Sequence, residues 1–178
     1  MRKIKYILCI VSNYIRMPLV KLFSGGKIKS SPQQIISMKT ELDVGEGGII
    51  NIDGRVHTEK NVLLSARNGG KLHFAGRAYV NRNSMIVCRK EITIGKGVTI
   101  GPNVVIYDHD HDMVTKGNLV CAPVSIGDNT WIGAGCTILK GVTIGKNSVV
   151  AAGTILTKNV PDNTVIRNHI TYMTKEMS

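Results

Sequence analysis

The chain has 178 residues, enough for one domain with an appendage, and its aromatic residues are few (2 Phe, 5 Tyr, 1 Trp). Isoleucine and valine dominate the apolar residues, which favours thin, regular β structure over a core of bulky rings. The net charge is +11, but residues 1–30 hold seven basic residues and no acidic one. The rest of the chain is therefore only mildly basic, which argues against a nucleic-acid-binding body.

Residues 1–26 are expected to form a basic, amphipathic helical appendage. Its apolar residues fall on one helical stripe: Ile4, Ile7, Leu8, Val11, Ile15 and Leu22. Pro18 is expected to kink or divide the helix. No unbroken run of about 18 apolar residues occurs, so we expect no transmembrane span.

A cleaved signal peptide is the alternative for this segment, because Met1–Lys5 resembles its charged start. No small-residue cleavage site follows, and Arg16 and Lys21 come too early, so a retained helix is favoured. Residues 1–24 then either contact an anionic membrane surface, pack on a neighbouring subunit or cap the body.

Beyond about residue 70 the sequence repeats with a period of six. Aliphatic residues recur at Ile94, Ile100 and Ile106, and again at Ile126, Ile132, Ile138, Ile144, Val150 and Leu156. A Gly or Ala usually follows each, and a small or β-branched residue stands four positions on. A weaker stretch at Phe74, Val80 and Ile86 is two residues out of phase, and residues 40–70 lack the register.

Each six-residue unit holds a short strand and a corner, and three units close one triangular coil whose inner positions keep a constant size. Gly and Asn suit the corners because they tolerate backbone angles that are costly for other residues. The sequence therefore predicts an all-β solenoid over residues 27–165, followed by a C-terminal tail at 166–178.

The repeat is interrupted between Ile106 and Ile126 by a polar segment that begins Asp108-His109-Asp110-His111. We expect an extruded loop at about 108–122, with His109 and His111 at its root. Function on rigid scaffolds concentrates in such loops.

The repeat over residues 72–160 resembles the hexapeptide-repeat acyltransferases, and this resemblance implies a left-handed parallel β-helix. The segment 108–111, followed by Thr130-Trp131-Ile132-Gly133, is similar to the sugar O-acetyltransferases of that family, including galactoside, maltose, capsule and lipopolysaccharide enzymes. The resemblance implies acetyl-CoA as co-substrate, no metal, and His109 as general base with His111 as the alternative.

The same resemblance assigns binding residues. Trp131 would line the tunnel for acetyl-CoA and acceptor, and Asn81 or Asn83 would help form the acceptor pocket, although either also suits a coil corner. The expected coenzyme contacts are Ala134, Ala152, Thr157 and Lys158. The chain departs from the family at Arg89, where galactoside enzymes have an acidic residue, and after Pro161, where Asn168 replaces a glycine.

The chemistry needs a base because an acceptor hydroxyl is a weak nucleophile at neutral pH. A neutral imidazole can remove its proton as it attacks the thioester. The other ring nitrogen should donate to a carboxylate or carbonyl, with Asp108, Asp110 and Asp112 as local candidates. We expect direct transfer in a ternary complex; a cysteine acyl-enzyme is the alternative.

Three other functions remain open. An N-acetyltransferase acting on an amino sugar differs only in its acceptor. A γ-type carbonic anhydrase would use His109 and His111 as zinc ligands with a third histidine, but none stands at a matching place in the repeat. A non-catalytic β-helix is disfavoured by the histidine loop and by Trp131.

The resemblance implies a homotrimer with active sites between subunits, acting on a sugar or lipid-linked glycan. The four cysteines show no CxxC pair and are read as reduced thiols. We expect a cytoplasmic protein, peripheral on the inner face of the plasma membrane if the basic helix binds lipid.

Overall fold

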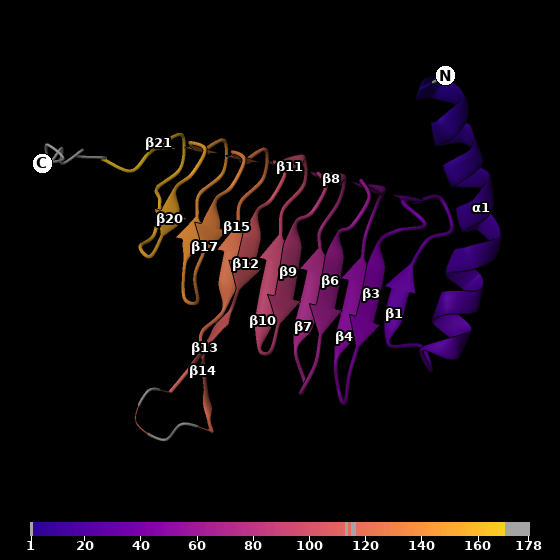
Figure 1. The fold of residues 1–178 in the computed structure, drawn as a ribbon, viewed down its shortest axis with the longest axis horizontal. Helices are drawn as coiled ribbons and strands as arrows, with labels where there is room; N and C mark the ends of the chain where they lie inside the picture. Colours follow the sequence, from indigo (N-terminus) through magenta and orange to yellow (C-terminus); the bar gives the residue numbers. More distant parts are fainter. Residues whose placement is uncertain (1, 113, 115–116, 170–178) are drawn as a thin grey trace, which may run out of the picture.

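The computed structural model describes residues 2–112, 114 and 117–169 as a parallel β-solenoid of about six turns with one helix across its end (Figure 1). The predicted fold class, a β-solenoid of the left-handed β-helix kind with an N-terminal helix and an extruded loop, is confirmed. Residues 170–178 of the predicted tail lie outside the described residues.

Three parallel sheets form the faces of the solenoid. The first holds β1 (Ile28–Ser30), β4 (Ile49–Ile52), β7 (Lys71–Phe74), β10 (Glu91–Ile94), β15 (Val124–Ile126) and β18 (Thr143–Ile144). The second holds β2 (Ile35–Ile36), β5 (Val56–Thr58), β8 (Ala78–Val80), β11 (Val98–Ile100), β16 (Trp131–Ile132), β19 (Val149–Val150) and β21 (Val165–Ile166). The third holds β3 (Glu41–Val44), β6 (Leu63–Ala66), β9 (Met85–Cys88), β12 (Val105–Tyr107), β17 (Thr137–Ile138) and β20 (Ile155–Leu156).

The six-residue repeat maps directly onto the core. All nine aliphatic repeat positions are buried. The residue four positions after each is buried as well, except after Ile106, where the hairpin interrupts the repeat. Equivalent positions stack along the axis, as in the pairs Ile94–Ile126 and Ile126–Ile144. Constant side-chain size at stacked positions keeps the coils parallel, which is why isoleucine and valine dominate.

The solenoid also includes residues 28–70, where the sequence shows no clear register. Paired positions there are 22 residues apart, as in Ile52–Phe74, compared with 20 for Phe74–Ile94 and 18 for Ile126–Ile144. The early coils therefore have longer corners, and this hides a strict period of six.

The reason for glycine differs between two kinds of corner position. Gly127, which directly follows a repeat isoleucine, has an ordinary backbone angle, but a Cβ there would lie 2.5 Å from the Lys146 nitrogen of the next coil. Seven asparagines of the described ranges instead adopt positive φ, including Asn83 and Asn129. The predicted reason, a costly backbone angle, therefore explains the asparagine positions. At Gly127 glycine is required because the coils stack too closely for a Cβ atom.

Helix α1 (Arg2–Phe23) lies across the first coil. Its inner face is fixed by Asn13, which is fully buried and donates to the backbone oxygens of Ile36 and Gln34. Arg16 donates to the oxygens of Ser37 and Thr40 at 2.9 and 3.1 Å. The expectation that Pro18 divides the helix is wrong, because α1 is continuous, while the expected kink stays a prediction. Proline removes only one helical hydrogen bond, and contacts with the first coil hold the rest.

By length and composition, α1 is one candidate membrane span. Its window Tyr6–Phe23 has a mean hydropathy of 1.3 over 18 residues, and 11% of that window is buried. The helix reaches this length and hydropathy without an unbroken apolar run, so the expectation of no transmembrane span stays a prediction. One such helix is weak support for a span by itself.

The predicted extruded loop is an antiparallel hairpin of β13 (His109–His111) and β14 (Leu119–Cys121). It projects sideways from the solenoid between β12 and β15 (Figure 1). We call the edge from which it leaves, where the third sheet passes into the first, the hairpin edge.

Candidate active site

A buried carboxylate lies at the root of the hairpin. Asp108 is fully buried, directly after β12. Its Oδ2 accepts the backbone N–H groups of Lys90 and Glu91, both at 2.7 Å, and its Oδ1 accepts that of Arg89 at 2.8 Å. These donors belong to the corner of the preceding coil, so the stacking of two coils creates the site.

The environment keeps Asp108 ionised. Burial by itself raises the pKa of a carboxyl group, but the N–H donors of Arg89 and Lys90, together with the His109 side chain, outweigh it. The pKa of Asp108 is therefore lowered. Burial, reinforced by the charge of Asp108, raises the pKa of the neighbouring Cys88 thiol, which stays protonated.

The Asp108 carboxylate orients His109. The Nδ1 of His109 lies 3.0 Å from Asp108 Oδ1, and its side chain is 14% exposed. The ring also packs edge-on against Tyr107, with centroids 5.5 Å apart. Because an ionised carboxylate can only accept, a neutral His109 carries its proton on Nδ1 and leaves Nε2 free to take another. Among the candidate aspartates, Asp108 has a carboxylate within hydrogen-bond distance of this ring.

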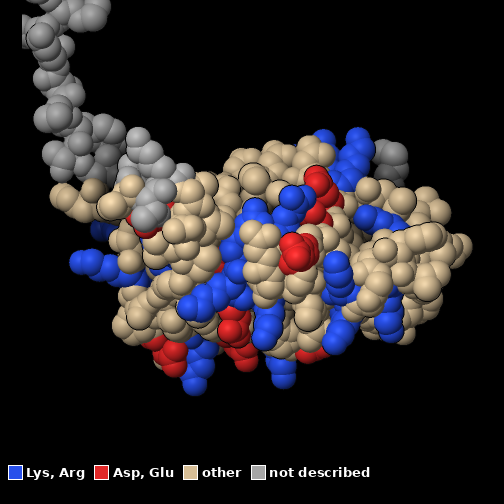
Figure 2. Space-filling model, turned by 90° about the horizontal axis from the view of Figure 1, so that it is seen from below, with Lys and Arg blue, Asp and Glu red and all other residues tan. Residues whose placement is uncertain are grey.

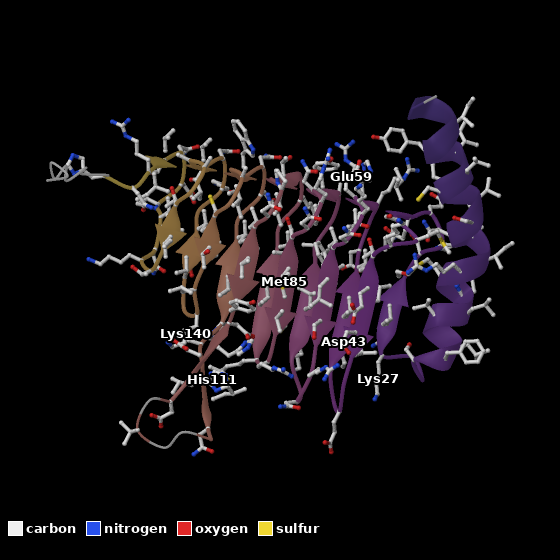
Figure 3. The ribbon with its side chains drawn as sticks, viewed as in Figure 1. Lys27, Asp43, Glu59, Met85, His111 and Lys140 are labelled. Atoms are coloured by element: carbon white, nitrogen blue, oxygen red, sulfur yellow. The ribbon has the colours of Figure 1, made fainter. Side chains whose placement is uncertain are left out.

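His111 lies at a more exposed position on the same strand. Figure 3 shows His111 and Lys140 near the base of the hairpin. Lys140, on the next corner of the hairpin edge, lies 3.3 Å from Asp110 Oδ2, and this contact lowers the pKa of Asp110. Asp110 therefore contacts the solenoid at the base of the hairpin, and it does not contact His109 in any described hydrogen bond.

Cys121 is a neighbour that the sequence did not reveal. It pairs with His109 directly across the hairpin, with Asp110–Val120 as the next pair. Directly opposed residues in such a ladder have Cβ atoms about 4.5–5.5 Å apart. Its distance of twelve positions from His109 carries no periodic signal, so only the hairpin register brings the two together.

The other predicted site residues fall on different edges of the same chain. Thr157 and Lys158 lie on the hairpin edge with His109, two coils further on, and both are exposed. Ala134 and Ala152 are exposed at the corner between the second and third sheets, which we call the Ala134 edge. A strand of the third sheet separates the two edges, a span of about 15 Å.

Asn81 and Asn83 also lie on the Ala134 edge, in the third coil. Asn83 has φ of 59°, and its amide bridges Asn61 and Asn103 in a ladder along the axis. Asn81 accepts the backbone N–H of Arg82 at 2.8 Å. Both therefore act as corner residues within one chain, and neither is brought to His109.

Trp131 stands in the second sheet, and its side chain is 55% exposed. A large ring with half its surface in solvent contributes little to the core, so it is available to contact a ligand or another subunit.

An apolar cleft of about 420 Å³ lies elsewhere, between α1 and the first coils, lined by Tyr6, Leu8, Met38 and Glu59 among others. Figure 3 places Glu59 well away from His111. The cleft contains no predicted site residue, so we base the candidate site on the geometry around His109. Within the described ranges, no group of three or more His, Cys, Asp or Glu side chains could hold a metal ion.

Comparisons with known proteins agree with the stacked coils and the six-residue spacing. The family model described as "Hexapeptide repeat of succinyl-transferase" matches residues 123–158. Residues 123–158 therefore match the hexapeptide repeat.

Curated relatives of this chain include enzymes named as sugar acetyltransferases. It is 41% identical over 101 residues to galactoside O-acetyltransferase from Escherichia coli K12, covering 54% of this chain and 50% of that protein. It is 29% identical to the putative lipopolysaccharide biosynthesis O-acetyl transferase WbbJ from the same organism, covering 67% of each. The chain spans only about half the length of the galactoside enzyme.

Solved structures give the same picture. A galactoside acetyltransferase in complex with coenzyme A has a TM-score of 0.51 at 29% identity, over 76% of this chain and 62% of that one. AntD, an N-acyltransferase from Bacillus cereus, has a TM-score of 0.65 at 18% identity, over 76% and 75% of the two chains. The second similarity concerns the fold alone.

Proposed function

We propose that this protein is an acetyl-CoA-dependent O-acetyltransferase that acts on a sugar hydroxyl, with His109 as general base. The observation that carries the proposal is the contact between the buried Asp108 and the half-buried His109 at the root of the hairpin, on a solenoid that carries the hexapeptide repeat. The similarity to galactoside O-acetyltransferase, and to a related structure that holds coenzyme A, supports the choice of substrates.

The reaction needs one proton to move twice. His109 Nε2 takes the proton of the acceptor hydroxyl as the hydroxyl oxygen attacks the carbonyl carbon of the acetyl group. The carbon–sulfur bond then breaks, and the imidazolium returns the proton to the leaving sulfur, which gives an acetyl ester and free coenzyme A. Asp108 stays ionised throughout and stabilises the imidazolium.

Exposed small residues fit a long, thin co-substrate. Ala134 and Ala152 follow one another along the Ala134 edge, with Gly135 and Gly153 beside them. Without bulky side chains, a pantetheine arm can lie against the coils and reach their backbone groups. Lys158 could pair with a phosphate of coenzyme A from the hairpin edge of a neighbouring chain.

The division of these residues between two edges supports a homotrimer. The Ala134 edge and the hairpin edge lie about 15 Å apart on one chain, too far for one thioester to contact both directly. Side-by-side packing would bring the Ala134 edge of one subunit against the hairpin edge of the next. We further propose that the enzyme is cytoplasmic, where its cysteines would stay reduced; none of the four, which all lie in the described ranges, is in a disulfide.

The test is release of free thiol from acetyl-CoA with a panel of neutral, acidic and amino sugars. We expect sugar-dependent release by the wild type and a fall in kcat of about 10²–10⁴-fold for His109→Ala. His111→Ala is the matched control, since it removes an exposed imidazole two residues away, and should stay within about threefold.

Equal losses in both histidine variants would contradict the assignment of His109. Release with amino sugars only, giving an amide product, would favour an N-acetyltransferase; AntD has the same fold and is named an N-acyltransferase. No release with any sugar, and no thermal stabilisation by coenzyme A, would contradict the proposed activity.

A further inference from the structure

The outer face of α1 is an apolar surface that the solenoid does not cover. Seven of its side chains are each more than half exposed: Ile4, Ile7, Leu8, Val11, Ile15, Leu22 and Phe23. Asn13 and Met17, on the opposite side of the helix, are buried against the first coil. A contiguous apolar face of this kind marks an interaction surface.

The chain segment that carries this face is basic. Residues 1–40 contain Arg2, Lys3, Lys5, Arg16, Lys21, Lys27, Lys29 and Lys39, and the first acidic residue is Glu41. Lys21, Lys27 and Lys29 are exposed near the C-terminal end of α1. In Figure 2 the helix end of the molecule, at the right, is mostly tan with blue side chains beside it.

We propose that α1 binds the protein to an anionic lipid bilayer, with its apolar face in the headgroup region and its axis parallel to the membrane. Apolar burial and attraction between lysines and anionic headgroups act together in such helices. A second copy of α1 fits less well, because two faces surrounded by like charges would repel each other.

The contacts of the inner face determine that α1 lies on the membrane and does not cross it. Asn13 and Arg16 donate to four backbone oxygens of the first coils, and these residues lie in the middle of the helix. A helix that crossed the bilayer would carry both polar side chains into hydrocarbon and lose these bonds. Length and hydropathy alone permit a span, and the packing opposes it.

This orientation makes the solenoid stand on the membrane with its axis away from the surface, since α1 runs across the end of the coil stack (Figure 1). His109 follows β12, in the fourth coil. Three coil spacings plus the distance from helix to sheet place it about 25 Å from the helix axis. The candidate site therefore stays in water, at a height that a few sugar units on a lipid carrier would reach.

The experiment is flotation of the full-length protein with vesicles of phosphatidylcholine alone or mixed with phosphatidylglycerol, at low and high salt. The variant Ile7→Gln, Val11→Gln, Ile15→Gln removes apolar side chains that face solvent, and glutamine is a good helix former. We expect the wild type to float with the mixed vesicles, and the variant to bind at least about tenfold more weakly.

The matched control is Ile155→Gln, Val165→Gln, which removes two exposed apolar side chains from the last coils of the solenoid. It should float like the wild type. Circular dichroism checks that both variants keep their helix. As an independent measurement, Ile15→Trp in a Trp131→Phe background should show blue-shifted emission on adding mixed vesicles, because the new ring enters the bilayer.

A wild type that does not float, or a triple variant that floats equally well, would overturn the proposal. A triple variant that changes the mass of the assembly while vesicle binding is unchanged would assign the face to a second copy instead. The readout is lipid binding and not turnover, so failure here leaves the proposed acetyltransferase activity untouched.

Discussion

Replacing Asp108 with asparagine tests whether the buried carboxylate orients His109. The carboxylate accepts three backbone N–H groups, the Cys88 thiol at 3.3 Å and His109 Nδ1 at 3.0 Å. An amide has only one oxygen. If that oxygen faces Lys90 and Glu91, the NH₂ group faces the N–H of Arg89 and the Nδ1 of His109.

Two consequences have different magnitudes. The buried N–H of Arg89 loses its partner, and the remaining bonds lose their charge, which should lower the free energy of unfolding by about 3 kcal/mol. The imidazole must accept at Nδ1, so its proton moves to Nε2 and the base is lost. We expect kcat to fall about 10²–10⁴-fold in the thiol-release assay.

The stability loss should also depend on pH. The pKa of Asp108 is lower in the folded protein than its usual value near 3.8, so the stabilisation by its charge is complete above about pH 4. It is lost as the pH falls through the lower folded-state value. The difference in denaturant midpoint between wild type and Asp108→Asn should therefore shrink in acid.

Asp43→Asn is the matched control. It removes another carboxylate of the third sheet, one that pairs with Arg67 at 2.7 Å on the partly exposed surface of the first coils. It should lower stability by about 1 kcal/mol or less and leave turnover unchanged. If Asp108→Asn kept activity within threefold of the wild type while folded, Asp108 would not orient the base and the reasoning would be refuted.

Variants at four further positions separate the roles of single side chains. Trp131→Ala should lower the free energy of unfolding by under about 1 kcal/mol, because the ring is half exposed, yet raise the KM for acetyl-CoA about fivefold or more. An unchanged KM would contradict the prediction that Trp131 lines the acetyl-CoA tunnel. Cys121→Ala should keep turnover within about twofold, whereas a loss beyond about 10²-fold would favour a cysteine acyl-enzyme. Phe74→Ala, at a fully buried ring, should lower the free energy of unfolding by about 3–5 kcal/mol, and a much smaller loss would mean that the core is not packed there. Asn129 has φ of 57°, so Asn129→Ala should be about 1 kcal/mol less stable than Asn129→Gly, since both lose the same amide contact with Asn147; equal stabilities would contradict the left-handed angle.

Spacing alone determined where the regular coils lie. From Ile94 onward the inward aliphatic positions follow from counting residues along the repeat. Each coil must place a side chain of similar size at the same inner position, because the core keeps the same cross-section from coil to coil. The break after Ile106 likewise located the hairpin, since a segment without the repeat has no place in the stack. Upstream, longer corners shifted the period, so residues 28–70 could not be assigned coil by coil from the sequence.

The glycines show how one residue type can serve two purposes. Their positions could be predicted from the sequence, but the reason for Gly127 lies in the backbone of the next coil, 18 residues along the repeat.

The apolar stripe of α1 could be predicted from the sequence as well. That its opposite side is hydrogen-bonded to the first coil, and so leaves the stripe outside, required the tertiary structure.

The sequence by itself determined the solenoid, the loop and the two histidines, because a repeat constrains each residue through its immediate neighbours in the coil. Only the tertiary structure decided that Asp108 is the carboxylate that holds His109, because its N–H donors come from a corner 17–19 residues earlier in the chain. It also placed Cys121 opposite His109 and separated the Ala134 edge from the hairpin edge. Such contacts depend on how coils stack and how the hairpin pairs, and no local pattern of residues encodes them.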